Sequence, residues 1–168
     1  MLGVERRFDL DLAVLEKTHR ELSRALHPDR YTQAGASERR AALDKAASVN
    51  EAWRTVRDPI KRAEALFRAH GIAVGENHEP KATPAFLMEV LEEREALAEA
   101  RVAKDLVKVR AIGAAMEARK VAIEKKLTQG FETATDQANI TKLTPLLGEL
   151  RFYRRFLDEV NAIEEENE

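Results

Sequence analysis

Apolar residues recur at spacings of three and four along most of the chain, and this pattern constrains the fold more than any other feature. Such spacing places side chains on one face of an α-helix. Charged residues make up 35% of the 168 residues and aromatic residues only 5%, a composition that favours long helices over sheets. The sequence therefore predicts an all-α fold. The longest repeat consists of Leu106, Val109, Ile112, Met116, Ile123, Leu127 and Phe131.

The N-terminal part of the chain predicts a helical hairpin followed by a short third helix. The first helix is expected over residues 12–26, because Pro28 disfavours helical geometry in the residue before it and lacks an amide hydrogen. After a polar loop, Ser37 is expected to cap the second helix. Pro59 can begin the third helix, and Gly71 can end it.

The C-terminal part predicts a three-helix antiparallel bundle over residues 84–168. The preceding residues 73–83 carry few apolar side chains and predict a linker between two domains. Thr83 and Pro84 form a typical N-cap and first-turn pair for the first bundle helix. Three helices with complementary apolar stripes and short connections pack as an antiparallel bundle.

The composition excludes several classes of protein. The chain has no cysteine, so disulfides and thiolate metal sites are excluded and a reducing compartment is expected. The net charge of −2 argues against nucleic acid as a partner. No apolar run approaches the roughly 20 residues that span a bilayer. We therefore expect a cytoplasmic protein with no membrane partner.

His27-Pro28-Asp29 forms a polar turn directly after the first helix. Proline fixes the turn and holds its neighbours outward at little entropic cost. Asp29 can accept a bidentate hydrogen bond from an arginine of a partner protein. Lys17, Arg20 and Arg24 lie on one face of the helix and can meet an acidic surface. The alternative is an ordinary helix-ending turn beside a solvated charged face.

The first bundle helix carries more apolar residues than one stripe requires. At about 100° per residue, its core stripe contains Phe86, Val90, Leu97 and Ala100. Leu87, Met88 and Leu91 fall off that stripe, beside Glu92 and Glu95. This second group can be a surface for a partner protein, or it can widen the core stripe.

The turn and its context resemble the J domain. The resemblance is carried by His27-Pro28-Asp29-Arg30-Tyr31, by Val49-Asn50-Glu51-Ala52-Trp53 and by Asp58-Pro59. The chain also resembles one branch of the J-domain proteins. That resemblance is carried by Asp58-Pro59-Ile60-Lys61-Arg62-Ala63-Glu64-Ala65-Leu66, by Gly71, by Ala85-Phe86-Leu87-Met88-Glu89 and by Leu150-Arg151-Phe152-Tyr153. That branch is the HscB-like co-chaperone family of iron–sulfur cluster assembly.

The resemblance implies a two-ended adaptor that is an activator rather than an enzyme, with no cofactor, metal site or catalytic residue of its own. A J domain over residues 1–72 would stimulate the ATPase of an HscA/DnaK-type chaperone, and the bundle would deliver the iron–sulfur cluster scaffold protein. The implied chaperone-binding residues are His27, Pro28, Asp29, Lys17, Arg20, Arg24 and Arg30. The implied scaffold-binding residues are Leu87, Met88, Leu91, Glu92, Glu95 and Phe152.

Two departures from the family pattern bear on the J domain. Family members usually carry a short aromatic-rich helix before the glycine that corresponds to Gly3, so we expect a truncated leading helix or a true start upstream. The cysteine cluster that binds zinc in eukaryotic relatives is absent. Within the J-domain interpretation, the alternative is a general protein-folding co-chaperone with a different client.

Three other interpretations fit less well. An enzyme that uses His27 as a base would need a nucleophile or a substrate pocket beside it, and the turn offers neither. The spacing of His19, His27, His70 and His78 matches no compact metal site. A helix-turn-helix DNA reader has a turn of about 3–4 residues, which is shorter than the loop expected here.

Overall fold

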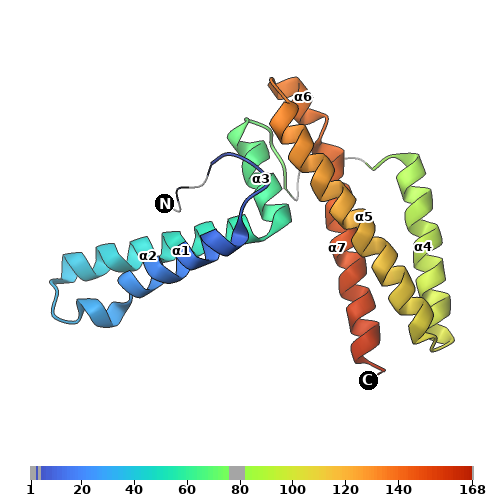
Figure 1. The fold of residues 1–168 in the computed structure, drawn as a ribbon, viewed down its shortest axis with the longest axis horizontal. Coiled ribbons are helices and arrows are strands. Elements are labelled where there is room, and N and C mark those ends of the chain that lie inside the picture. Colours follow the sequence, from blue (N-terminus) through green and yellow to red (C-terminus); the bar gives the residue numbers. More distant parts are fainter. Residues whose placement is uncertain (1–2, 4, 76–81, 168) are drawn as a thin grey trace. The chain divides into compact units, whose positions relative to one another are not determined.

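The structure is a computed structural model that describes Gly3, residues 5–75 and residues 82–167. These residues form helices and no β-strand, so the predicted all-α fold is confirmed. The chain divides into two compact units, Met1–Leu66 and Phe67–Glu168. Figure 1 shows their helices, which are α1 (Leu12–Ala25), the 3-10 helix η1 (Pro28–Tyr31), α2 (Ala36–Arg57), α3 (Pro59–Ala69), α4 (Pro84–Val102), α5 (Leu106–Thr133), α6 (Gln137–Thr141) and α7 (Thr144–Glu165).

In the first unit, α1 and α2 pair as a hairpin (Figure 1). The predicted first helix begins as expected, because the Asp11 carboxylate accepts a hydrogen bond from the Val14 amide at 3.0 Å. The predicted Ser37 cap is wrong: the N-cap of α2 lies two residues earlier, at Gly35, and makes no side-chain hydrogen bond. The helix therefore starts on backbone geometry alone.

Polar and aromatic contacts join the two helices of the hairpin. The His19 ring stacks on the Trp53 ring with 5.3 Å between centroids. The His19 Nε2 atom also lies 2.9 Å from the Asn50 Oδ1 atom. No residue of α1 is fully buried, and its Leu15 and Leu22 are half-buried. The fully buried apolar residues of the unit are Phe8, Ala42, Val49, Ala63 and Leu66.

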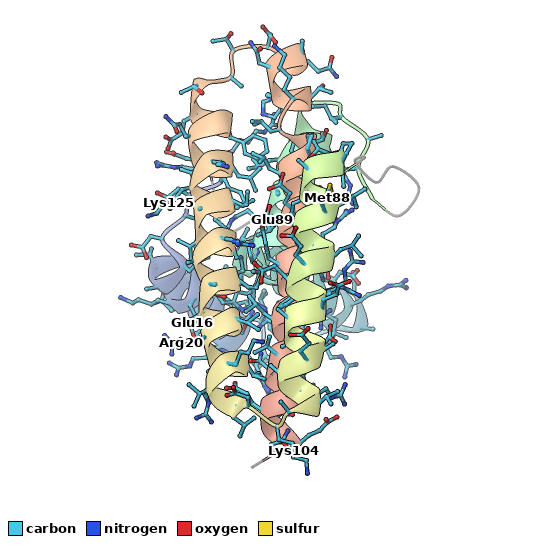
Figure 2. The ribbon with its side chains drawn as sticks, turned by 90° about the vertical axis from the view of Figure 1, so that its right-hand side faces the viewer. Glu16, Arg20, Met88, Glu89, Lys104 and Lys125 are labelled. Atoms are coloured by element: carbon cyan, nitrogen blue, oxygen red, sulfur yellow. The ribbon has the colours of Figure 1, made fainter. Side chains whose placement is uncertain are left out.

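The second unit contains the bundle of α4, α5 and α7 (Figures 1 and 2). Close approach of α5 and α7 depends on Gly113, because a Cβ atom at that position would lie 2.9 Å from the Val160 Cγ1 atom. Arg119 of α5 fixes α4 through ion pairs to Glu89 at 2.7 Å and to Glu93 at 2.9 Å. The residues that α7 buries are Leu147, Leu150, Phe152, Tyr153, Phe156, Val160 and Ile163.

The last residues of α3 belong to this second unit by their contacts. Phe67 is fully buried, with its ring centroid 5.1 Å from that of Phe131. The Gln137 side chain donates a hydrogen bond to the Gly71 carbonyl at 3.3 Å. The contacts thus divide the chain within α3, and a domain boundary at residues 73–83 stays a prediction. Residues 76–81 of the predicted linker, with His78, lie outside the described residues.

Candidate functional site

The His27-Pro28-Asp29 turn is built on η1, which follows α1 directly. His27 occupies the N-cap position, and its Nδ1 atom accepts a hydrogen bond from the Asp29 amide at 3.4 Å. The same Nδ1 atom lies 3.5 Å from the Asp29 Oδ2 atom. The side chains of His27 and Asp29 are 59% and 85% exposed, so both remain available to a partner.

Local hydrogen bonds hold this turn in place. The Arg30 amide donates to the His27 carbonyl at 3.0 Å, and the Thr32 hydroxyl donates to the Asp29 carbonyl at 3.3 Å. The Tyr31 hydroxyl reaches back to the Ala25 carbonyl of α1 at 3.4 Å. Short-range hydrogen bonds of backbone and side chains therefore fix the turn while the Asp29 side chain stays largely exposed, which favours docking with little ordering cost.

A group of cations flanks the turn. Lys17, Arg20 and Arg24 on α1 and Arg30 on η1 are all exposed. None of these four forms an ion pair with any residue that the structure describes. Their positive charge is thus not neutralised within the described part of the chain, and it can attract an acidic surface over about a Debye length.

The second surface lies on the N-terminal half of α4. The Thr83 hydroxyl accepts a hydrogen bond from the Phe86 amide at 3.2 Å and starts the helix as predicted. Leu87, Met88 and Leu91 are 51%, 64% and 61% exposed. We call these three residues, with the exposed Glu92 and Glu95, the α4 patch. Figure 2 shows Met88 on α4, with Glu89 on the side that faces α5.

The predicted division of α4 into two faces agrees with the observed burial. Leu97 and Ala100 are buried, and Phe86 and Val90 are half-buried, so the predicted core stripe faces the bundle. Glu89 lies on this inner side as well, through its ion pair with Arg119. The α4 patch is therefore not a widening of the core stripe.

Phe152 does not share the exposure of the other predicted scaffold-binding residues. It is only 7% exposed, and its ring packs edge-on against Phe86 at 5.5 Å between centroids. Phe152 is therefore not exposed beside the α4 patch, because Phe86 packs against it from α4. Its part in binding the scaffold stays a prediction.

Two ionisable groups of α7, the partly buried Glu149 and the buried Tyr153, have shifted pKa values. Burial raises the pKa of the Glu149 carboxyl; the Lys126 charge lowers it and the Glu89 charge raises it. Burial raises the pKa of Tyr153 to about 12, and the charges of Glu89 and Glu149 add to this effect. Sequence periodicity did not identify Glu89, Arg119 or Glu149, because it cannot show which charges meet across helices.

Residues 5–75 and 82–167, with Gly3, contain no group of three His, Cys, Asp or Glu residues that could hold a metal ion. Across the same residues, none of the helices has the length and apolar character needed to span a bilayer.

Comparisons with known proteins are consistent in both sequence and fold. Residues 82–161 match the family model described as the HSCB C-terminal oligomerisation domain. A co-chaperone protein HscB homolog of Burkholderia multivorans is 34% identical over 156 residues, which cover 93% of this chain and 87% of that protein. A homolog of Cupriavidus taiwanensis is 42% identical over 100 residues, 60% of this chain and 57% of that one.

Two solved structures share the fold. The chaperone HscB from Vibrio cholerae matches with a TM-score of 0.84 and 27% identity, covering 98% of this chain and 95% of that chain. The human co-chaperone protein HscB matches with a TM-score of 0.85 over 97% of this chain and 79% of that chain. Its sequence identity is 24%, so this match supports the fold alone. The predicted arrangement of a J domain followed by a helical bundle is confirmed by these neighbours.

Proposed function

The chain belongs to the HscB family of co-chaperones, and from this premise we propose that it assists iron–sulfur cluster assembly by joining two partners. The J domain stimulates the ATPase of an HscA/DnaK-type chaperone, and the bundle delivers the iron–sulfur cluster scaffold protein to that chaperone. The nucleotide is hydrolysed by the partner, so this chain is an activator of an ATPase rather than an enzyme.

The chaperone-binding role is supported by the exposed turn. The Asp29 side chain in the first turn of η1 is largely exposed and can accept a bidentate hydrogen bond from an arginine. The cations on α1 raise the rate of encounter with an acidic surface. We assign the chaperone contact to His27, Pro28, Asp29, Lys17, Arg20, Arg24 and Arg30.

The scaffold-binding role is supported by the exposure of three large apolar residues on one helix of a well-packed bundle. This single observation carries the proposal. Leu87, Met88 and Leu91 are each more than half exposed. Contiguous apolar side chains on the surface of a soluble protein mark interaction sites. Glu92 and Glu95 beside them favour a basic rim on the partner.

The test is the steady-state ATPase rate of HscA/DnaK-type chaperones, with and without this protein and with and without the scaffold protein. We expect stimulation by this protein alone and further stimulation when the scaffold is present. No stimulation of any such chaperone would contradict the chaperone-binding role. Stimulation that the scaffold leaves unchanged, but that another client increases, would instead favour a general folding co-chaperone.

A further inference from the structure

One ring nitrogen of His27 lies close to both a donor and an acceptor of Asp29, in the turn that closes the α1–α2 hairpin (Figure 1). The Nδ1 atom accepts the hydrogen bond from the Asp29 amide at 3.4 Å, and it lies 3.5 Å from the Asp29 Oδ2 atom. A ring nitrogen accepts a hydrogen bond only when it carries no hydrogen, and the neutral ring then holds its hydrogen on the other nitrogen. This hydrogen bond therefore assigns a neutral ring with its hydrogen on Nε2 to the observed turn.

We propose that His27 is a positioning residue for Asp29 that acts only while its ring is neutral, so that acidification weakens chaperone docking. The inference rests on the proposed chaperone-binding function and adds the regulation of that same site. In the neutral state the ring caps η1 and fixes the Asp29 backbone. The Asp29 carboxylate is then left to accept hydrogen bonds from an arginine of the chaperone.

Protonation of the His27 ring reverses both relations. The Nδ1 atom becomes a donor, so it no longer accepts the hydrogen bond from the Asp29 amide and the cap of η1 is lost. The charged ring instead pairs with the Asp29 carboxylate, which already lies within ion-pair distance. A chaperone arginine must displace this internal partner before it reaches the carboxylate, so docking weakens.

The charged groups around the ring leave Asp29 as its acidic partner. Arg24 of α1 precedes the ring and accepts a hydrogen bond from the His27 amide at its carbonyl, at 3.5 Å, and Arg30 follows on η1. The helix α2 also packs against η1, but none of its charged side chains forms an ion pair with the ring within the described part of the chain. The charged residues in the first half of α2 are Glu38, Arg39, Arg40, Asp44 and Lys45.

The first test is the concentration of this chain that gives half-maximal stimulation of the chaperone ATPase, measured at pH 7.5 and at pH 5.5 at constant ionic strength. Histidine ordinarily becomes half charged near pH 6.5, and only the neutral fraction docks, so we expect this concentration to rise by about 10-fold at the lower pH. Each rate is compared with the unstimulated rate of the chaperone at the same pH. A client peptide that stimulates the chaperone without this chain serves as the control for the chaperone itself.

Three variants assign the pH dependence to the His27 ring. His27→Asn places an amide oxygen where Nδ1 lies, which accepts the Asp29 amide hydrogen but does not titrate. Its half-maximal concentration should change by less than about 2-fold between the two pH values, and at pH 7.5 it should be at least about 5-fold lower than that of His27→Ala, which has no cap. His70→Gln, an exposed change in the second unit, should keep the native pH dependence.

A second measurement follows the ring in the native chain and needs no activity. Nitrogen-15 NMR should find the hydrogen of the neutral His27 ring on Nε2, and the Asp29 amide resonance should titrate with the same midpoint as that ring. The spectrum of His27→Asn identifies the His27 signals by their loss. His19 is half-buried and stacked on Trp53, so its separate titration shows whether the Asp29 amide follows the wrong histidine.

The outcomes separate this inference from the proposed function. If the native chain stimulates the chaperone equally well at both pH values, or if its neutral His27 ring carries the hydrogen on Nδ1, the inference is wrong while the chaperone-binding role stands. A His27→Asn variant that keeps the native pH dependence, or that is as inactive as His27→Ala, would overturn it as well. If the native chain stimulates no HscA/DnaK-type chaperone at pH 7.5, the proposed function fails and this regulation fails with it.

Discussion

The two units of this chain bury their helices to very different extents. In the first unit no residue of α1 is fully buried, and a stacked His19–Trp53 pair joins α1 to α2. In the second unit α7 alone buries seven residues, including Phe156 and Leu147 with no exposed surface. Packing density of this kind is what specifies a single rigid arrangement.

This difference changes the meaning of exposed apolar side chains. In the first unit Val14 and Leu43 are more than half exposed, beside a small core, and their exposure follows from thin packing. In the second unit a separate set of residues supplies the inner face of α4, with Leu97 and Ala100 buried and Phe86 and Val90 half-buried. The exposed Leu87, Met88 and Leu91 are therefore surplus to the fold, which is the property expected of a binding surface.

The largest effect should come from the turn, although it lies in the thinly packed unit. Asp29→Asn should remove nearly all stimulation of the chaperone ATPase, because it removes the charge that would pair with the chaperone's arginine. The exposed position makes the cost to folding no more than about 0.5 kcal/mol. Steady-state ATPase assays and a thermal melt measure the two quantities. Full stimulation by this variant would remove Asp29 from the proposed contact.

The second effect tests the claim that the α4 patch is surplus to the bundle. Replacing Leu87, Met88 and Leu91 together by alanine should weaken scaffold binding by about 30-fold or more, equivalent to about 2 kcal/mol. The unfolding free energy should change little, because these side chains are exposed. Stimulation of the chaperone without scaffold should survive and serves as the control. Destabilisation by several kcal/mol would instead make these residues part of the core.

The third effect tests the difference in packing directly. The free energy of the openings that allow amide hydrogen exchange should be at least about 2 kcal/mol lower in α1 and α2 than in α5 and α7. The reason is that burial of each large apolar side chain contributes about that much. Native-state hydrogen exchange on the full chain measures both units in one sample. Equal protection in the two units would show that polar pairing stabilises α1 as well as apolar burial stabilises α7.

The sequence predicts features within one helix better than contacts between helices. The spacing of Phe86, Val90 and Leu97 predicted which face of α4 is inward, because a helix fixes the angles between its own side chains. The burial of Phe152 could not be predicted, because it depends on Phe86 of another helix, which periodicity within α7 cannot show. The five residues of α6 are too few to display a repeat, so that helix was not predicted.

A smaller effect concerns electrostatic steering in the first unit. If Lys17, Arg20 and Arg24 attract an acidic chaperone surface, raising the salt concentration should slow association several-fold and leave dissociation nearly unchanged. Replacing the three by glutamine should abolish this salt dependence. Lys125→Gln, an exposed change in the second unit, is the matched control. Stopped-flow association rates decide the point, and a salt-independent rate for the native chain would leave these cations without a role in docking.

The smallest effect arises from Glu149, in the well-packed unit. Burial raises the pKa of Glu149 in the folded chain above its ordinary value, so the folded state binds the proton more tightly than the unfolded state does. The associated stability is fully present below the unfolded pKa and is lost as the pH rises through the folded pKa. Since Lys126 opposes the shift and the group is partly solvated, we expect a modest loss of stability on going from about pH 4 to about pH 7.

Glu149→Gln isolates this contribution, because the amide carries no titrating proton while it keeps the shape of the side chain. The unfolding free energy of the native chain, relative to that of Glu149→Gln, should therefore fall as the pH rises through the weakly acidic range. Glu159→Gln, at an exposed position of the same helix, controls for the loss of one negative charge. Urea unfolding followed through the C-terminal unit measures the difference at each pH. A difference that stays constant across this range would mean that the Glu149 carboxylate reaches water as freely in the folded bundle as in the unfolded chain.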